Sequence, residues 1–123
     1  MVNILIDCDP GIDDCLAILM VLNHLNDSKN ILSAVTTVGG NATIEDTSKN
    51  THSLLNFYKT QSTSNLDFDN IPIGVGAAQP IEGKFHYAYD FHGKNGLGID
   101  LSKYYLKKTT LPANEILSKI GND

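Results

Sequence analysis

Four aspartates lie close together near the N-terminus. Residues 7–14 read Asp-Cys-Asp-Pro-Gly-Ile-Asp-Asp, so every second side chain on average is a carboxylate. Like charges at this density repel each other unless something offsets them, and a hard divalent cation held by oxygen ligands does so. A cation bound by aspartates can also activate water. The spacing therefore predicts a cation site with hydrolytic chemistry at this turn.

A structural explanation covers part of this acidic cluster. Aspartate is a common helix N-cap, and acidic side chains in the first turn complement the helix dipole. This accounts for Asp13 and Asp14, which precede an apolar helical pattern. It does not account for Asp7 and Asp9, nor for the Pro-Gly turn at residues 10–11 between the two pairs. We therefore expect the cluster to serve chemistry as well as helix capping.

The elements around the cluster predict an α/β fold with an open, mostly parallel, Rossmann-like sheet and flanking helices. Three apolar runs predict strands, over residues 2–6, 31–38 and 71–75. Helical patterns follow, over residues 13–25, over residues 43–58 and from Pro112 onward. Strands that alternate with helices are typical of parallel sheets with right-handed crossovers. Because the chain ends inside its third helix and no fourth strand follows, we expect part of a single domain that is truncated after three strands.

Three conspicuous segments each follow one of these strands. The acidic cluster follows the first strand, Gly39-Gly40-Asn41 follows the second, and a long connection over residues 76–111 follows the third. Ligands of open parallel sheets bind beyond the carboxyl ends of the strands. We therefore expect the three segments to meet at one edge of the sheet.

The long connection is rich in rings and glycines, and two interpretations of it stay open. Connections of this length are usually functional or disordered. It carries, among other rings, those of His86, Tyr87, Tyr89, Phe91 and His92. It can be a mobile flap over a flat ligand such as a nucleobase, or an ordinary surface excursion with one or two aromatic rings packed against the sheet.

Composition excludes several classes of partner. Nine lysines face fourteen acidic residues, for a net charge of −5, which argues against nucleic-acid binding. No apolar stretch approaches the length of a membrane span, and no signal peptide is visible at the N-terminus. Cys8 and Cys15 fit reduced cytosolic thiols better than a disulfide framework, and the four histidines lack zinc-like spacing. We therefore expect a cytoplasmic protein without membrane or nucleic-acid partners.

Three blocks of sequence resemble the inosine-uridine preferring nucleoside hydrolases. The first is the acidic cluster with Ala17-Ile18, the second runs from residue 34 to Asn41 with Thr43, and the third is the His-Gly-Lys-Asn-Gly-Leu-Gly segment at residues 92–98. They occur in the family's order and at similar spacing. The resemblance implies a calcium-dependent hydrolase that cleaves the N-glycosidic bond of small-molecule ribonucleosides. It also makes a homo-oligomer plausible for a full-length relative.

The resemblance implies roles for the aspartates. Asp9 would ligate Ca²⁺ and serve as general base toward a water on the ion, and Asp14 would be a second ligand. Asp13 would bind a ribose hydroxyl. Asp7 would orient its neighbours without touching the ion.

The resemblance implies substrate contacts for two further residues. Asn41 matches an asparagine that lines the water and ribose site. His92 matches a histidine near the base pocket. Together with Asp13, they are the expected substrate-binding residues of this chain.

The length of the chain sets it apart from the family. Family members are more than twice as long, and their remaining calcium ligands and a late histidine near the leaving base would lie beyond residue 123. A calcium shell with missing ligands binds weakly. We therefore expect impaired activity from this chain alone, and a catalytically inactive remnant or fragment is the non-enzymatic alternative.

A different enzyme class also places an Asp-x-Asp pair after a strand. In haloacid-dehalogenase-type phosphohydrolases the first aspartate of the pair is a nucleophile, used with Mg²⁺. Asp7 and Asp9 could serve in this way. Gly11 stands where those enzymes usually have Thr or Val, and Asp13-Asp14 would have no role. This alternative is the weaker one.

Overall fold

Four parallel strands form the sheet, in the order β1-β2-β3-β4. The computed structural model describes residues 1–106 and 108–122. The strands are β1 (Asn3–Cys8), β2 (Ile31–Thr37), β3 (Ile73–Val75) and β4 (Leu111–Pro112). The predicted open, parallel α/β architecture is confirmed.

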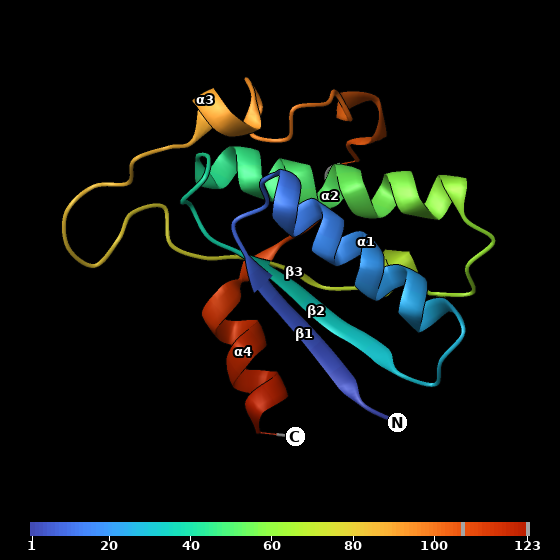
Figure 1. Cartoon of the computed structure of the whole chain (residues 1–123). Helices are drawn as coiled ribbons and strands as arrows, with labels where there is room; N and C mark the ends of the chain where they lie inside the picture. The colour runs from blue at the N-terminus through green and yellow to red at the C-terminus, as the bar shows by residue number, and fades with distance from the viewer. Residues whose placement is uncertain (107, 123) are drawn as a thin grey trace.

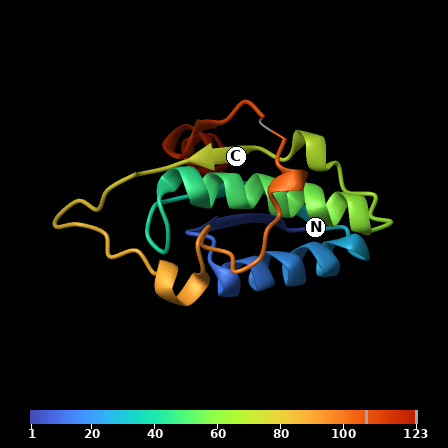
Figure 2. The same cartoon turned by 90° about the horizontal axis from the view of Figure 1, so that it is seen from above.

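The helices cover both faces of the sheet. Figures 1 and 2 show α1 (Ile12–Asn26) and α2 (Ile44–Gln61) side by side on one face, and α4 (Ala113–Gly121) on the other. The four-residue helix α3 (Tyr89–His92) and the 3₁₀ turns η1 (Phe68–Asn70) and η2 (Ser102–Tyr104) lie in the connections. Within the described residues, no helix is both long and apolar enough to span a membrane.

The prediction that the sheet has three strands was wrong by one short strand. Gly74 pairs with Leu111 and Val75 with Pro112, which adds β4 beside β3. Two exposed residues are too few to show a strand period, so the pattern could not predict this element. Pro112 consequently occupies the N-cap position of α4, one residue before the helix begins.

The apolar core lies between the sheet and the pair α1 and α2. From α1 it receives four side chains spaced three or four residues apart, Cys15, Ile18, Leu22 and Leu25. Leu16 and Met20 of the same apolar pattern remain 60% and 66% exposed. From α2 the core receives Leu54 and Leu55. This packing fixes the direction of both helices, and therefore where their N-termini meet the strand ends.

The carboxyl ends of the strands are level with one another. Cys8 pairs with Thr37, and Thr37 pairs with Val75. The segments that follow begin at Asp9, Val38 and Gly76, so all three leave the sheet at the same edge, as the order of elements predicts. This edge places the acidic cluster, the asparagine loop and the long connection together.

The long connection has two differently attached parts. Residues 78–87, here called the projecting loop, extend away from the sheet edge in both views (Figures 1 and 2). Residues 88–105, here called the anchored segment, run back across α1 and α2 and place Leu97 and Leu101 in the core.

Candidate active site

The acidic turn joins β1 to α1 and is closed by hydrogen bonds among its own residues. Gly11 is the N-cap of α1, which puts Asp13 and Asp14 in the first helical turn. The Oδ2 atom of Asp14 accepts the backbone N–H of Asp9 at 3.2 Å. The carboxylate of Asp14 thus reaches back over the turn to Asp9, two residues before the N-cap Gly11.

Asn41 joins the asparagine loop to this turn. Its backbone N–H donates to Oδ2 of Asp9 at 2.8 Å, and its side-chain Nδ2 donates to the Asp9 carbonyl oxygen at 3.1 Å. A Cβ atom at Gly40 would overlap the Asp9 carboxylate, so glycine permits the close approach. The structure therefore brings Asp9, Asp14 and Asn41 into one hydrogen-bonded group.

The charges of this group are not balanced by a neighbouring cation among the described residues. Burial and the nearby Asp9 carboxylate raise the pKa of Asp14 above its usual value. Burial, together with the charge of Asp14, also raises the pKa of the Cys8 thiol to about 12. A site that disfavours its own carboxylate charge in this way is suited to a bound cation.

His92 lies against the acidic turn through an unexpected contact. Its Nδ1 atom accepts the backbone N–H of Ile12, the first residue of α1, at 3.1 Å, and its side chain is 5% exposed. A Cβ atom at Gly11 would come within 2.6 Å of the His92 ring, so the ring packs directly on the backbone of the turn. The imidazole therefore caps the first N–H of α1, a helix that has no side-chain cap at its N-cap residue.

Asp7 and Asp13 lie apart from the hydrogen-bonded group. Asp7 belongs to β1, and its Oδ1 atom accepts the Thr36 hydroxyl of β2 at 2.5 Å. It therefore stabilises the pairing of the two strands, and no described contact joins it to Asp9 or Asp14. Asp13 is exposed on the first turn of α1, where its carboxylate is free to meet a ligand.

Two residues that support the site were not identified from the sequence. Asn50, buried in α2, donates from Nδ2 to the Asn95 carbonyl at 2.9 Å and to the Pro10 carbonyl at 3.5 Å. Tyr89 contacts the start of α2 through its hydroxyl group. No sequence pattern indicates the role of Asn50. For Tyr89, the sequence at the start of α2 gives an indirect sign, because it leaves the Thr43 N–H without a local acceptor. Asp46, the third residue of that helix, is too short to close a capping box on Thr43.

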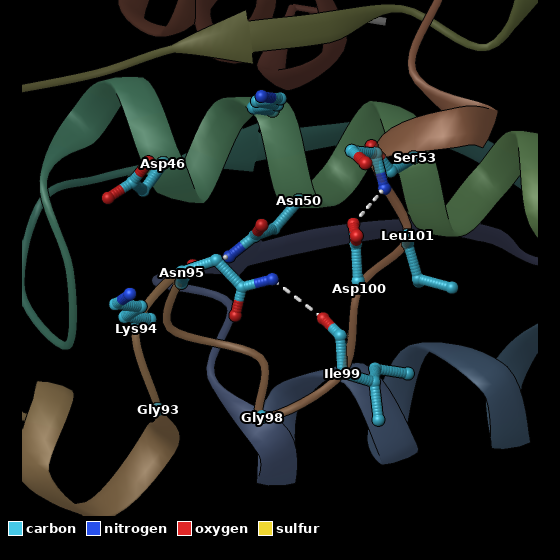
Figure 3. Close-up of a pocket in the computed structure, with 12 residues that line it drawn as sticks. Asp46, Asn50, Ser53, Gly93, Lys94, Asn95, Gly98, Ile99, Asp100 and Leu101 are labelled. Atoms are coloured by element: carbon cyan, nitrogen blue, oxygen red, sulfur yellow. Dashed lines mark hydrogen bonds between the residues drawn. The ribbon is translucent and has the colours of Figure 1, made fainter.

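A groove of about 470 Å³ lies beside the site rather than in it. It runs between α2 and the anchored segment, and Figure 3 shows Asn50 and Asn95 between these two elements with Asp46 and Lys94 at one end. Its lining includes none of Asp9, Asp14 or Asn41. The groove is therefore separated from the acidic turn by the contacts of Asn50 and the anchored segment.

The described residues hold only part of a metal shell. No group of three or more His, Cys, Asp or Glu side chains in residues 1–106 and 108–122 is arranged to hold an ion. Asp9 and Asp14 fit a hard cation in ligand type, because both offer carboxylate oxygens, and in electrostatics, because burial and the charge of Asp9 raise the pKa of Asp14. From this chain, the predicted cation would receive these two carboxylates.

Comparison with known proteins identifies the family. The sequence profile of the inosine-uridine preferring nucleoside hydrolases matches residues 4–120. The chain belongs to this family. It is 36% identical over 119 residues to uridine nucleosidase 1 of Arabidopsis thaliana, and 33% identical over 111 residues to the non-specific ribonucleoside hydrolase RihC of Escherichia coli O139:H28. The family shown is the one that the three sequence blocks resemble, rather than the haloacid-dehalogenase type.

The nucleoside hydrolase relatives are longer than this chain. The alignments cover 95% and 89% of this chain but 32% and 33% of the plant and bacterial proteins, so the chain spans about a third of their length. Among solved structures, a plant nucleoside hydrolase, the PpNRh1 enzyme, superposes with a TM-score of 0.68 at 26% identity. The superposition covers 98% of this chain and 36% of the plant enzyme. The fold and the family are thereby shown for this chain.

Proposed function

We propose that the acidic turn and the asparagine loop belong to a site that hydrolyses the N-glycosidic bond of ribonucleosides. The observation that carries the proposal is the hydrogen-bonded group of Asp9, Asp14 and Asn41 at the carboxyl ends of the strands. Family membership supports it, since the relatives named above are nucleosidases.

Asp9 is the proposed general base. Its Oδ2 atom accepts the Asn41 N–H, which leaves Oδ1 available to take a proton from the attacking water. The carbonyl of Asp9 is held by the Asn41 amide, so both ends of the residue are fixed in orientation. Cleavage passes through an oxocarbenium-like state at the ribose, which nearby carboxylates stabilise.

Three residues are the proposed substrate contacts. Asp13, exposed on the first turn of α1, would accept a hydrogen bond from a ribose hydroxyl. Asn41 uses Nδ2 within the protein, which leaves its Oδ1 atom for a ribose hydroxyl or the attacking water. His92 uses Nδ1 on α1, so only its Nε2 edge is available toward a base.

Calcium is the proposed cofactor, held by Asp9 and Asp14. When bound, it would supply a shell that accepts many oxygen ligands at once and makes a coordinated water more acidic. Asp7 would act indirectly, since its carboxylate holds β1 against β2 immediately before Asp9. Because this chain supplies few of the six to eight ligands that calcium takes, we expect weak binding by residues 1–123 alone.

A chimaera tests the proposal. Residues 4–120 would replace the matching part of the Escherichia coli ribonucleoside hydrolase, and release of reducing sugar from inosine and uridine would be followed. We expect turnover by the chimaera, little or none by the 123-residue chain, and a loss of roughly a hundredfold or more in Asp9→Asn, because a general base contributes that much.

Asp27→Asn is the matched control, because Asp27 is exposed at the C-terminal end of α1, far along the helix from the acidic turn. It should leave turnover unchanged. Calorimetric titration of calcium into the same proteins should show weaker binding in Asp9→Asn only. Equal turnover and equal calcium affinity in the chimaera and its Asp9→Asn variant would contradict the role of Asp9 as general base and calcium ligand.

A further inference from the structure

We propose that α3 is a positioning element of this site, in which Tyr89 and His92 bind the N-termini of α2 and α1 and so keep Asn41 and Asp14 in place around Asp9. The two rings lie one helical turn apart, three residues along α3. Each reaches the beginning of a different helix, and each of those helices follows one loop of the site. The inference rests on the proposed function for its consequence in catalysis, but its geometry stands independently.

Tyr89 completes an unfinished cap on α2. The Thr43 hydroxyl accepts the N–H of Asp46 at 3.2 Å, which is the first half of a capping box. The second half needs the third-position side chain to reach back to the Thr43 N–H, and Asp46 is a methylene short. The Tyr89 hydroxyl fills this gap, since it accepts the Thr43 N–H at 3.0 Å and donates to Oδ2 of Asp46 at 2.6 Å.

His92 makes the equivalent contact on α1. The N-cap of that helix is Gly11, which has no side chain to accept the free N–H groups of the first turn. Nδ1 of His92 accepts the Ile12 N–H from 80 residues further along the chain. The other ring nitrogen of His92, Nε2, is not among the buried side-chain atoms that lack a hydrogen-bond partner. In the described residues only Nδ1 of His52 is such an atom, so Nε2 of His92 is open to solvent.

The two contacts act on the site through short backbone distances. Asn41 lies two residues before Thr43, and its carbonyl oxygen accepts the N–H of Ala88, the residue before α3, at 2.8 Å. Asp14 lies two residues after Ile12, in the same helical turn. Figure 2 shows α3 beside the beginning of α1. Fixing both helix starts to one rigid turn therefore fixes the separation of the carboxylate of Asp14 and the amide of Asn41.

Amide hydrogen exchange of Tyr89→Phe tests the contact with α2. This change removes one hydroxyl group and keeps the ring. Exchange of the Asn41 N–H should therefore speed up about three- to tenfold, the factor that corresponds to the net free energy of one hydrogen bond. Adding Asp46→Glu should restore wild-type exchange, because glutamate can close the capping box on Thr43 directly. Amides of Ile6 and Val35 in the strands serve as internal controls and should not change.

A pair of variants tests the contact with α1. His92→Asn keeps an acceptor at the position of Nδ1, whereas His92→Leu keeps bulk and loses the acceptor. The Asp9 N–H, which donates to Asp14, should exchange about three- to tenfold faster in His92→Leu and close to the wild-type rate in His92→Asn. Equal exchange in the two variants would show that the ring acts by packing alone and would overturn this half of the proposal.

Calcium titration links these changes to the site. Affinity should fall in Tyr89→Phe by a similar factor and return when Asp46→Glu is added. If the wild-type protein binds no calcium, the proposed cofactor fails while the exchange rates still decide the role of α3. Unchanged Asn41 exchange in Tyr89→Phe, or faster exchange that Asp46→Glu does not reverse, overturns the proposal for α2.

Discussion

The projecting loop and the anchored segment follow each other in one connection, yet they are attached to the protein in opposite ways. In the described structure no hydrogen bond involves residues 78–87. The anchored segment, in contrast, is tied to both site loops and to α2 by Ala88, Tyr89, His92 and Asn95. It is further held by Asn56, whose Nδ2 atom donates to the Tyr104 carbonyl at 2.8 Å.

This difference in attachment assigns the flap interpretation to the projecting loop only, because the anchored segment packs against the protein. A flap needs a segment with few hydrogen bonds to the rest of the protein, and residues 78–87 meet that condition. A segment that supports a site needs many such hydrogen bonds, and residues 88–105 provide them. The rings that the sequence presents as one group are thus separated, with His86 and Tyr87 in the projecting loop and Tyr89 and His92 in the supporting part.

Limited proteolysis gives the largest expected contrast between the two parts. Lys84 and Lys94 are both exposed, one in each part, and a lysine-specific protease can attack either. Cleavage requires local opening, which is nearly free in an unbonded loop and costly where several long-range bonds must break. We expect cleavage after Lys84 to be roughly a hundredfold faster, which corresponds to about 2.7 kcal/mol of local stability.

The readout for this comparison is mass spectrometry of the first fragments in native buffer. Digestion in urea is the control, because both sites should then be cut at similar rates. Comparable native rates at the two lysines would show that the anchored segment opens as readily as the projecting loop, and would remove the distinction drawn between them.

The sequence predicted the parts of the fold whose side chains repeat with a period. Strands β1 and β2 and the helices α1 and α2 extend over runs long enough to show that period, and the strand ends follow from it. Strand β4 and helix α3 have two and four residues, too short for any period. The aspartates were found by type and spacing alone, because an acidic turn is local in sequence.

The supporting contacts of the site could not be predicted in the same way. The contact of His92 with Ile12 joins residues 80 positions apart, and Tyr89 reaches Thr43 over 46 positions. Such pairs are decided by tertiary packing rather than by local pattern. The short side chain of Asp46 in an incomplete capping box was the one local sign that another group must satisfy the Thr43 N–H.

Adding one methyl group to a glycine gives the second contrast, at Gly11, against which His92 of the anchored segment packs, and at Gly83 of the projecting loop. In Gly11→Ala the new Cβ would lie 2.6 Å from Cε1 of His92 and 2.9 Å from Nδ2 of Asn41. Overpacking of this kind costs about 1–3 kcal/mol of unfolding free energy. In Gly83→Ala the Cβ meets nothing within 4 Å, and only the positive φ of 81° opposes it. An unbonded loop can relax that strain, so we expect a loss below about 1 kcal/mol.

Urea denaturation of the two glycine variants measures this contrast directly. Gly11→Ala should also displace His92, and therefore speed exchange of the Ile12 amide, whereas Gly83→Ala should leave that amide unchanged. An equal loss of stability in both variants would mean that the contact between His92 and the acidic turn is loose.

The smallest effect is expected at the far end of the anchored segment, where Tyr105 packs edge-on against the ring of His52 at 6.0 Å. Burial and the charge of Lys108 lower the pKa of His52 below its usual value. His52 therefore binds a proton more readily in the unfolded chain than in the folded protein. The stabilising contribution is present above the ordinary histidine pKa of about 6.5 and is lost as the pH falls below it, with a slope of at most about 1.4 kcal/mol per pH unit.

His52→Gln should flatten the fall in unfolding free energy between pH 7.5 and 5, whereas the matched change of the exposed His24 on α1, His24→Gln, should not. Parallel pH profiles for wild type and His52→Gln would show that protonation of this ring does not loosen the anchored segment.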